Sequence, residues 1–200
     1  GGALTDLDTI NVVGGDFTIS NAVTGVDTDF NINGGRTVTV NDTLEGGGSL
    51  TLAGTSVLDI AAGSSATFNT LVESTGAQVN VDIDSQNGNS LLAFTTATQD
   101  ASDASISIDI SGVSQSTTAT VVQGVTTNFG TVDFGTVGIL LEASSTLSSG
   151  NLVVTVTRTE TSSVSSNSQN TAAADAIDSL ATSSDATIVS IQNALSTATT

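Results

Sequence analysis

Large apolar residues alternate with polar ones in short segments along the first four fifths of the chain. Each segment places large apolar side chains at every second position, mostly with Thr, Asn or Asp between them. Successive side chains of a strand point to opposite faces, so this period of two predicts half-buried β-strands. The predicted strands are residues 10–12, 17–19, 30–32, 38–40, 50–52, 58–60, 79–83, 106–110, 132–134, 139–141 and 152–156.

Glycine-rich links between these strands indicate how the strands connect. They include Gly14-Gly15, Gly34-Gly35, Gly46-Gly47-Gly48 and Gly63-Ser64-Ser65. Short strands joined by such corners favour a chain that winds in one direction, with stacked rungs of about 20–25 residues that each contribute two or three strands. We therefore expect an all-β solenoid over residues 1–160, built from about six or seven rungs around one apolar column. A β-sandwich is the structural alternative.

The composition changes near Thr159, and the apolar period changes with it. Residues 161–170 are rich in Ser and Thr, which predicts a linker or exposed loop. Residues 171–200 form a helical segment, with short helices expected at about 171–181 and 185–196 that dock at the open end of the solenoid. Ser183 or Ser184 is the expected N-cap of the second helix, with Asp185 in its first turn. The predicted buried faces are Ala173, Ala176, Ile177 and Leu180 in the first helix, and Ile188, Ile191 and Leu195 in the second.

The charge balance and the missing residue types exclude several classes of function. The 200 residues include 20 Asp and Glu but only two basic residues, Arg36 and Arg158, which gives a net charge of -18. Two cations cannot neutralise a polyphosphate, so nucleic acid and anionic membranes are not expected partners. Without Cys or His, disulfides, thiol nucleophiles, His-based triads and zinc or haem sites are excluded. No apolar run reaches the roughly 18 residues of a membrane helix, so no membrane insertion of this segment is expected.

High charge and abundant Ser and Thr are also typical of disordered chains. Here 38% of the residues are hydrophobic, the mean hydropathy is +0.24 and proline is absent. The apolar residues are also periodic, so we expect a folded chain.

Three blocks, in order, resemble parts of bacterial autotransporter passenger domains. LEGGGSLTLAGTSVLDIAAGSSATFNT (residues 44–70) resembles their strand–turn repeats. TATVVQGVTTNFGTVDFGTVGILLEASSTLSSGNLVVTVTRT (residues 118–159) resembles their last rungs, and NTAAADAIDSLATSSDATIVSIQNALSTA (residues 170–198) resembles the helical stretch that follows. The resemblance implies a right-handed parallel β-helix, exported and displayed at, or released from, an outer membrane. The family continues into a membrane barrel, so this chain is expected to be either a cleaved or excised passenger or a module that works without a barrel.

One group of oxygen-bearing side chains is a candidate calcium site. Asp82, Asp84, Asn87 and Asn89 follow one another in VNVDIDSQNGNS, and Ca²⁺ takes six to eight oxygen ligands. Gly88 falls one position late for a helix–loop–helix calcium loop, so a solvated strand face followed by a turn explains the same residues. The pairs Asp6/Asp8 and Asp27/Asp29 repeat the spacing, and the same solvated-face interpretation applies to them. No other cofactor is expected.

The sequence offers little for catalysis. Polysaccharide-cleaving enzymes need paired carboxylates in a groove or a basic residue that abstracts a proton. Carboxylate pairs are present in this chain, but it has neither Lys nor His. Its only aromatic residues are six Phe, mostly in phase with the core. We therefore expect no enzymatic activity, and a carbohydrate-active β-helix is kept as an alternative. Arg36 and Arg158 are expected to be local charge partners. The Thr-x-Thr pairs at Thr37/Thr39 and Thr155/Thr157/Thr159 are expected to be ordinary strand surface.

Two functions fit these features best. The first is a non-enzymatic structural or adhesive rod at the bacterial cell surface or released outside the cell, with host or matrix glycans or proteins as candidate partners. The second is a subunit that assembles head to tail into a filament or surface layer. An end rung has unpaired backbone groups, so we expect the N-terminal end to pair with further rungs, from a longer parent chain or from another subunit.

Overall fold

The computed structural model describes residues 8–96, 99–138, 140–164, 168–180, 183 and 185–197. Its strands form three sheets, each with its strands in hydrogen-bonded order. Sheet A contains β1 (Thr9–Val12), β4 (Asp29–Ile32), β7 (Ser49–Leu52) and β10 (Thr70–Glu73). Sheet B contains β15 (Thr131–Asp133), β13 (Ser105–Gly112), β11 (Gln78–Asp84), β8 (Val57–Ile60), β5 (Thr37–Val40) and β2 (Phe17–Ile19). Sheet C contains β16 (Leu141–Ser148), β17 (Asn151–Arg158), β14 (Thr117–Gln123), β12 (Leu91–Phe94), β9 (Ser65–Phe68), β6 (Thr43–Gly46) and β3 (Val23–Val26).

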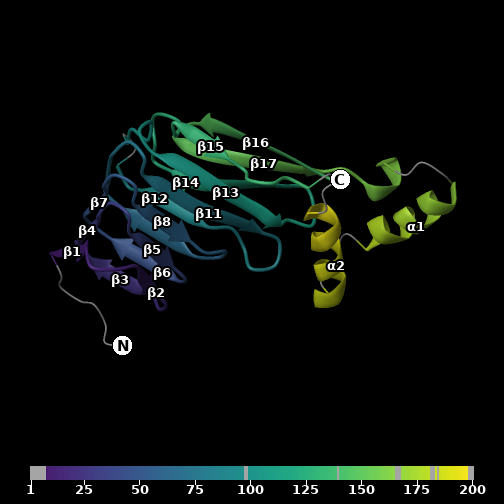
Figure 1. Cartoon of the computed structure of the whole chain (residues 1–200), viewed down its shortest axis with the longest axis horizontal. Helices are drawn as coiled ribbons and strands as arrows, with labels where there is room; N and C mark the ends of the chain where they lie inside the picture. Colours follow the sequence, from purple (N-terminus) through teal and green to yellow (C-terminus); the bar gives the residue numbers. More distant parts are fainter. Residues whose placement is uncertain are drawn as a thin grey trace.

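From β1 to β12, consecutive strands belong to sheets A, B and C in turn, and we call each set of three a triplet. Each strand of a triplet pairs in parallel with the equivalent strand of the next triplet. Thr9 is level with Asp29 and Val38 with Leu58, so the early triplets repeat after about 20 residues, as expected from the sequence. Figure 1 shows the strands stacked from the N-terminal triplet to the later strands, with the two helices to the right of the strands.

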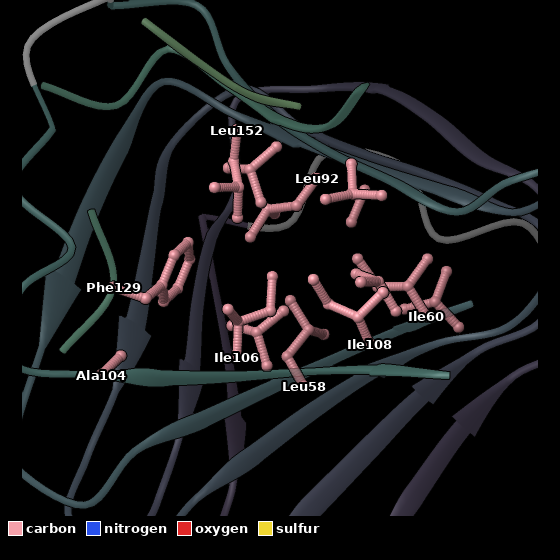
Figure 2. Close-up of a cluster of buried hydrophobic side chains, with 14 of the residues drawn as sticks. Leu58, Ile60, Leu92, Ala104, Ile106, Ile108, Phe129 and Leu152 are labelled. Atoms are coloured by element: carbon pink, nitrogen blue, oxygen red, sulfur yellow. The ribbon is translucent and has the colours of Figure 1, made fainter. Parts of the chain in front are cut away.

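Inward-pointing residues of equivalent strands form columns between the sheets. In sheet B one column contains Phe17, Val38, Leu58, Val79 and Ile106 at matched register positions. Figure 2 shows Leu58, Ile60, Ile106 and Ile108 pointing toward Leu92 and Leu152 of sheet C. Each such side chain contributes roughly 1.5–3 kcal/mol on burial, so the columns supply much of the stability.

Sheet C contains small inward residues where a ring from the next strand needs room. A Cβ built on buried Gly46 would lie 2.7 Å from a ring carbon of Phe68, so the Phe68 ring occupies the space of that missing side chain. The same ring packs against Phe30 of sheet A, with their centroids 6.2 Å apart.

The C-terminal part of the sheets departs from parallel stacking. β17 pairs antiparallel with both β14 and β16. β16 and β17 are joined by the two residues Ser149 and Gly150, whose φ angles of 51° and 80° suit a tight hairpin turn. The expectation that one winding direction continues to residue 160 is therefore wrong for these last two strands.

Most of the predicted strands are present in the structure. Every predicted segment before residue 120 coincides with a strand of sheet A or B, and residues 152–156 lie in β17. Residues 132–134 overlap β15, while Ile139 lies outside the described residues and Leu141 begins β16. The strands that the alternation did not predict are β3, β6, β9, β10, β12 and β14.

The two short helices are present, but their predicted faces match only in part and the predicted cap is wrong. The predicted linker contains a 3₁₀ helix, η1 (Thr161–Val164), and the start of α1 (Ser168–Ser179), which packs against η1; α2 (Ala186–Thr197) contacts β13. In α1 Ala174 is buried and Ile177 is half-buried, whereas Ala173, Ala176 and Leu180 are exposed. In α2, Val189 and Gln192 are buried and Ile188 is half-buried, whereas Ile191 is 53% exposed. The faces are rotated because α1 is oriented by its contacts with η1 and α2 by β13.

The N-cap of α2 is Asp185 itself, whose Oδ1 accepts hydrogen bonds from the N–H groups of Thr187 and Ile188. Ser183 lies before it, and its Oγ accepts from the Asp185 N–H. Ser184 and the side chain of Leu195 lie outside the described residues. No helix in the described ranges is long and apolar enough to cross a membrane.

Candidate functional site

Asp84, a predicted calcium ligand, closes a turn at the end of β11. Its Oδ1 accepts hydrogen bonds from the N–H groups of Gln86 and Asn87, at 2.6 and 2.8 Å, and its Oδ2 accepts from Asn87 Nδ2. The carboxylate also lies against Gly112 of β13, where a Cβ would be 2.4 Å from Asp84 Oδ2. Both oxygens therefore already have polypeptide donors, which is the turn interpretation given by the sequence.

Asp82 lies two residues earlier, on the outer face of sheet B. Its Oδ2 accepts a hydrogen bond from the Ala62 N–H, and its register neighbour on β13 is Asp109. Burial, together with the negative charges of Asp109, Asp59 and Asp84, raises the pKa of the Asp82 carboxyl. Asn89 is exposed. Within the described ranges no group of three His, Cys, Asp or Glu side chains could hold a metal ion, and a calcium site at these residues stays a prediction.

Of the other acidic pairs, Asp27/Asp29 lies within the described residues, and its two side chains have different surroundings. Asp6 lies outside the described residues, and Asp8 is exposed. Asp29 turns to the next strand of sheet A, where its Oδ1 accepts from the N–H and Oγ of Ser49. Those two hydrogen bonds lower the pKa of the Asp29 carboxyl. Asp27 is exposed and lines a groove.

That groove, about 430 Å³ in volume, runs over the links between sheet C and sheet A. Asn69 donates from Nδ2 to the Gly47 carbonyl and accepts from Thr95 Oγ1 at 2.5 Å, so the polar groups of three triplets form a ladder there. The groove offers carboxylate, amide and hydroxyl oxygens and no aromatic surface on which a sugar ring would stack. Its lining residues are Asp27, Glu45, Gly46, Gly47, Thr67, Asn69 and Thr95.

Glu73, at the end of β10, did not stand out in the sequence. Its Oε1 accepts a hydrogen bond from the Asp103 N–H at 2.7 Å, while Oε2 is buried without a hydrogen-bond partner. Burial raises the pKa of this carboxyl, and the charges of Asp103 and Asp100 add to the effect. A spacing of thirty residues separates Glu73 from Asp103, so only the fold brings them together.

Arg158 is a local charge partner, as predicted. Its Nη1 lies 3.3 Å from Asp178 Oδ1, and the two side chains are 5% and 13% exposed. Asp178, on α1, also accepts the N–H groups of Thr161 and Ser162, each at 2.9 Å. Burial opposes ionisation of this carboxyl, but these hydrogen bonds prevail and lower its pKa to about 2. This cluster, which we call the C-terminal clasp, fastens η1 and α1 to the end of β17.

The remaining sequence candidates are surface features. Arg36 is half-buried before β5, and no ion pair of it is found among the described side chains. Thr39 donates to Asp59 Oδ2 at 3.4 Å across sheet B, and Thr155 and Thr157 are exposed on β17. These residues form ordinary strand surface.

The most unusual exposed region is the N-terminal surface, residues 10–17, where β1 and β2 end sheets A and B. Phe17 is 39% exposed, although Val38 and Leu58 in the same column are fully buried. Val13 is 62% exposed, and a hollow of about 340 Å³ lies along residues 10–17. In the described part of the chain, apolar side chains and strand edges are thus left open together at this end.

No protein-family model, no curated protein and no solved structure matches this chain. The geometry described above therefore carries the functional argument.

Proposed function

We propose that this chain is a non-enzymatic, stiff structural or adhesive rod that acts at a bacterial cell surface or after release from it. In this proposal the three sheets together form a right-handed parallel β-solenoid, of the kind found in autotransporter passengers. The sequence resemblance supports the family, and no comparison bears on it.

One observation carries the proposal: inward apolar columns continue from triplet to triplet in matched parallel register. Each triplet contacts mainly its neighbours, so length is gained without a change of cross-section. The outward positions of the strands are mostly polar, and the chain carries 20 acidic residues against two basic ones, which favours solubility and repels nonspecific neighbours.

The N-terminal surface indicates how the rod would be extended. A further rung there would pair with β1, β2 and β3 and cover Phe17 and Val13, as each later triplet covers the one before it. A head-to-tail filament would also need three parallel edges at the other end. That end instead carries the antiparallel β16–β17 hairpin and α2 against β13, so we favour extension at the N-terminal surface.

Localisation in the organism that encodes the chain tests the proposal. An epitope inserted between the exposed residues Gly135 and Thr136 is expected to be detected by antibody on intact cells or in the culture supernatant, and to be removed by added protease. A cytoplasmic protein with the same epitope controls for lysis. Labelling that requires permeabilised cells would overturn the proposal. Deleting the chain should lower adherence to matrix- or glycan-coated surfaces without loss of any hydrolytic activity.

A further inference from the structure

β16 forms one edge of sheet C and is the longest edge strand in the described structure. All eight of its residues pair with β17 in unbroken register, from Leu141 opposite Arg158 to Ser148 opposite Asn151. Among the residues that the structure describes, no strand pairs with its other side. The other strands that end a sheet, β1, β10, β2, β15 and β3, have three or four residues each.

The backbone groups that face outward from β16 can be identified from the pairing. The Thr159 N–H donates to the Leu140 carbonyl, so residues 140 and 159 are a hydrogen-bonded pair. Such pairs alternate in an antiparallel ladder, so residues 142, 144, 146 and 148 bond to β17. The N–H and C=O groups of Ala143, Ser145 and Leu147 therefore point away from β17.

This edge lacks the devices that usually prevent pairing with another strand. Natural edges are protected by proline, lysine, bulges or inward-pointing charges. β16 has no bulge in its register, and the chain contains neither proline nor lysine. Its one charged residue is Glu142, near one end and on the exposed face.

We propose that β16 pairs antiparallel with β16 of a second copy of this chain, around a two-fold axis at Ser145. In this register Ala143 lies opposite the partner subunit's Leu147, and Ser145 lies opposite the partner subunit's Ser145. All three outward-facing residues of each copy then form hydrogen-bonded pairs, which gives about six new backbone hydrogen bonds. The edge is thus complementary to itself.

The side chains fit the same register. Ala143, Ser145 and Leu147 share the half-buried inner face, so alanine and leucine from the two copies become neighbours on that face. On the outer face Glu142 lies opposite the partner subunit's Ser148. The two Glu142 carboxylates are then six residues apart, about 20 Å along the strand, which exceeds the Debye length of about 8 Å at physiological salt. A second copy therefore meets no like charge directly across this edge.

A single cysteine provides the most direct test, because the chain has none of its own. In the proposed dimer the Cα atoms at position 145 are about 5.5 Å apart, within disulfide range. The variant Ser145→Cys is expected to form a cross-linked dimer under mild oxidation within minutes. The control Thr155→Cys, exposed on β17, is expected to stay monomeric. Phe17→Asp, which alters the N-terminal surface, should leave the cross-linking through position 145 unchanged.

Sedimentation velocity of the native chain over a concentration series gives an independent measurement. Raised salt should favour the dimer because each copy carries a net charge of -18. Ser145→Pro removes an N–H group that points away from β17, but no hydrogen bond to β17, so the hairpin is kept. The dissociation constant of the dimer should then increase about tenfold or more. Circular dichroism checks that the variant is folded.

A charge exchange tests the register itself. Ser144 lies opposite the partner subunit's Thr146, so Ser144→Glu with Thr146→Glu should weaken the dimer, and Ser144→Lys with Thr146→Glu should strengthen it. A native chain that is monomeric at all concentrations and salts would overturn the proposal. So would equal cross-linking of Ser145→Cys and Thr155→Cys, or a dimer that responds alike to both charge pairs.

Discussion

The two ends of the strand stack are built differently. At the N-terminal end, β1–β3 have the same parallel geometry as the triplets that follow, and Phe17 and Val13 are exposed there. At the other end the strands reverse into the β16–β17 hairpin, α2 packs against β13, and the C-terminal clasp holds α1. Among the described residues, no strand pairs with the outer edges of β1, β2 and β3, whereas local structure covers the other end.

The difference shows what repetition does and does not provide. Inside the stack, each triplet is satisfied by its two neighbours, so similar sequences suffice for all of them. At an end one neighbour is missing, and the unpaired edges need a specific solution. At the C-terminal end, the clasp that holds η1 and α1 depends on single residues such as Arg158 and Asp178.

Replacing large side chains by alanine in the middle and at the exposed end of the sheet B column should give the largest difference in stability. Leu58→Ala removes a fully buried side chain and is expected to lower the free energy of unfolding by about 2–5 kcal/mol. Phe17→Ala, at the exposed end of the same column, should cost about 1 kcal/mol or less, because water already reaches the ring. Urea denaturation monitored by circular dichroism measures both. Equal losses of stability in the two variants would mean that Phe17 is covered in solution. The N-terminal end would then not be open, and the contrast with the C-terminal end would disappear.

The closed end should be opened by removing the negative charge of the clasp. Asp178→Asn leaves the Arg158 guanidinium buried without a counter-charge and weakens two hydrogen bonds to η1. The local stability of η1 and α1 is expected to fall by about 3 kcal/mol. Amide exchange should become faster in η1 and α1, while sheets A and B keep their protection. Asp175→Asn, on the exposed side of α1, is the matched control. If both variants exchange alike, the clasp does not close this end.

Lowering the pH should stabilise the sheets and destabilise the C-terminal clasp. The raised pKa values of Asp82 and Glu73 mean that these groups bind protons more readily in the folded state. Their contribution to the free energy of unfolding therefore rises as the pH falls through the raised values, and the gain is complete below the unfolded values near 4. The lowered pKa of Asp178 gives the reverse sign: about 2 kcal/mol is present above its unfolded value of 3.8 and is lost as the pH falls toward 2.

A pH series of urea denaturation and amide exchange measures both effects. Between pH 7 and about 4.5 the sheets should become more stable, and α1 should exchange faster only at lower pH. Asp82→Asn should reduce the increase in sheet stability that accompanies the fall in pH. An unchanged increase would mean that the burial of Asp82 does not contribute to it.

Sequence reasoning predicted every strand of sheets A and B except β10, because their inward positions hold large apolar residues. Leu50 with Leu52, and Leu58 with Ile60, are such pairs. In sheet C, β6 and β9 were missed because their inward residues include Gly46 and Ala66, which are small, whereas β12 was missed although its inward Leu92 and Phe94 are large. Gly46 has to be small because the Phe68 ring fills its space, and that need is visible only when β6 and β9 lie side by side in sheet C.

The candidate sites likewise depend on contacts between residues that are distant in the sequence. The sequence pointed to the carboxylates around Asp84, and the turn that it closes was one of the stated interpretations. It gave no sign that Glu73 would meet Asp103, or that Asp178 would lie beside Arg158. These contacts join residues about twenty to thirty positions apart that become neighbours through the folding of the chain.

The smallest expected effect concerns the cap of α2, which distinguishes the two helices of the closed end. Asp185→Ala removes the acceptor for the Thr187 and Ile188 N–H groups and should destabilise α2 by about 1 kcal/mol. Thr187→Ala, exposed in the same turn, should change little and serves as the control. Amide exchange should quicken in α2 but not in α1, because the clasp at Asp178 is untouched. If α1 quickened as well, the two helices would open as one unit, and the closed end would depend on the α2 cap as much as on the clasp.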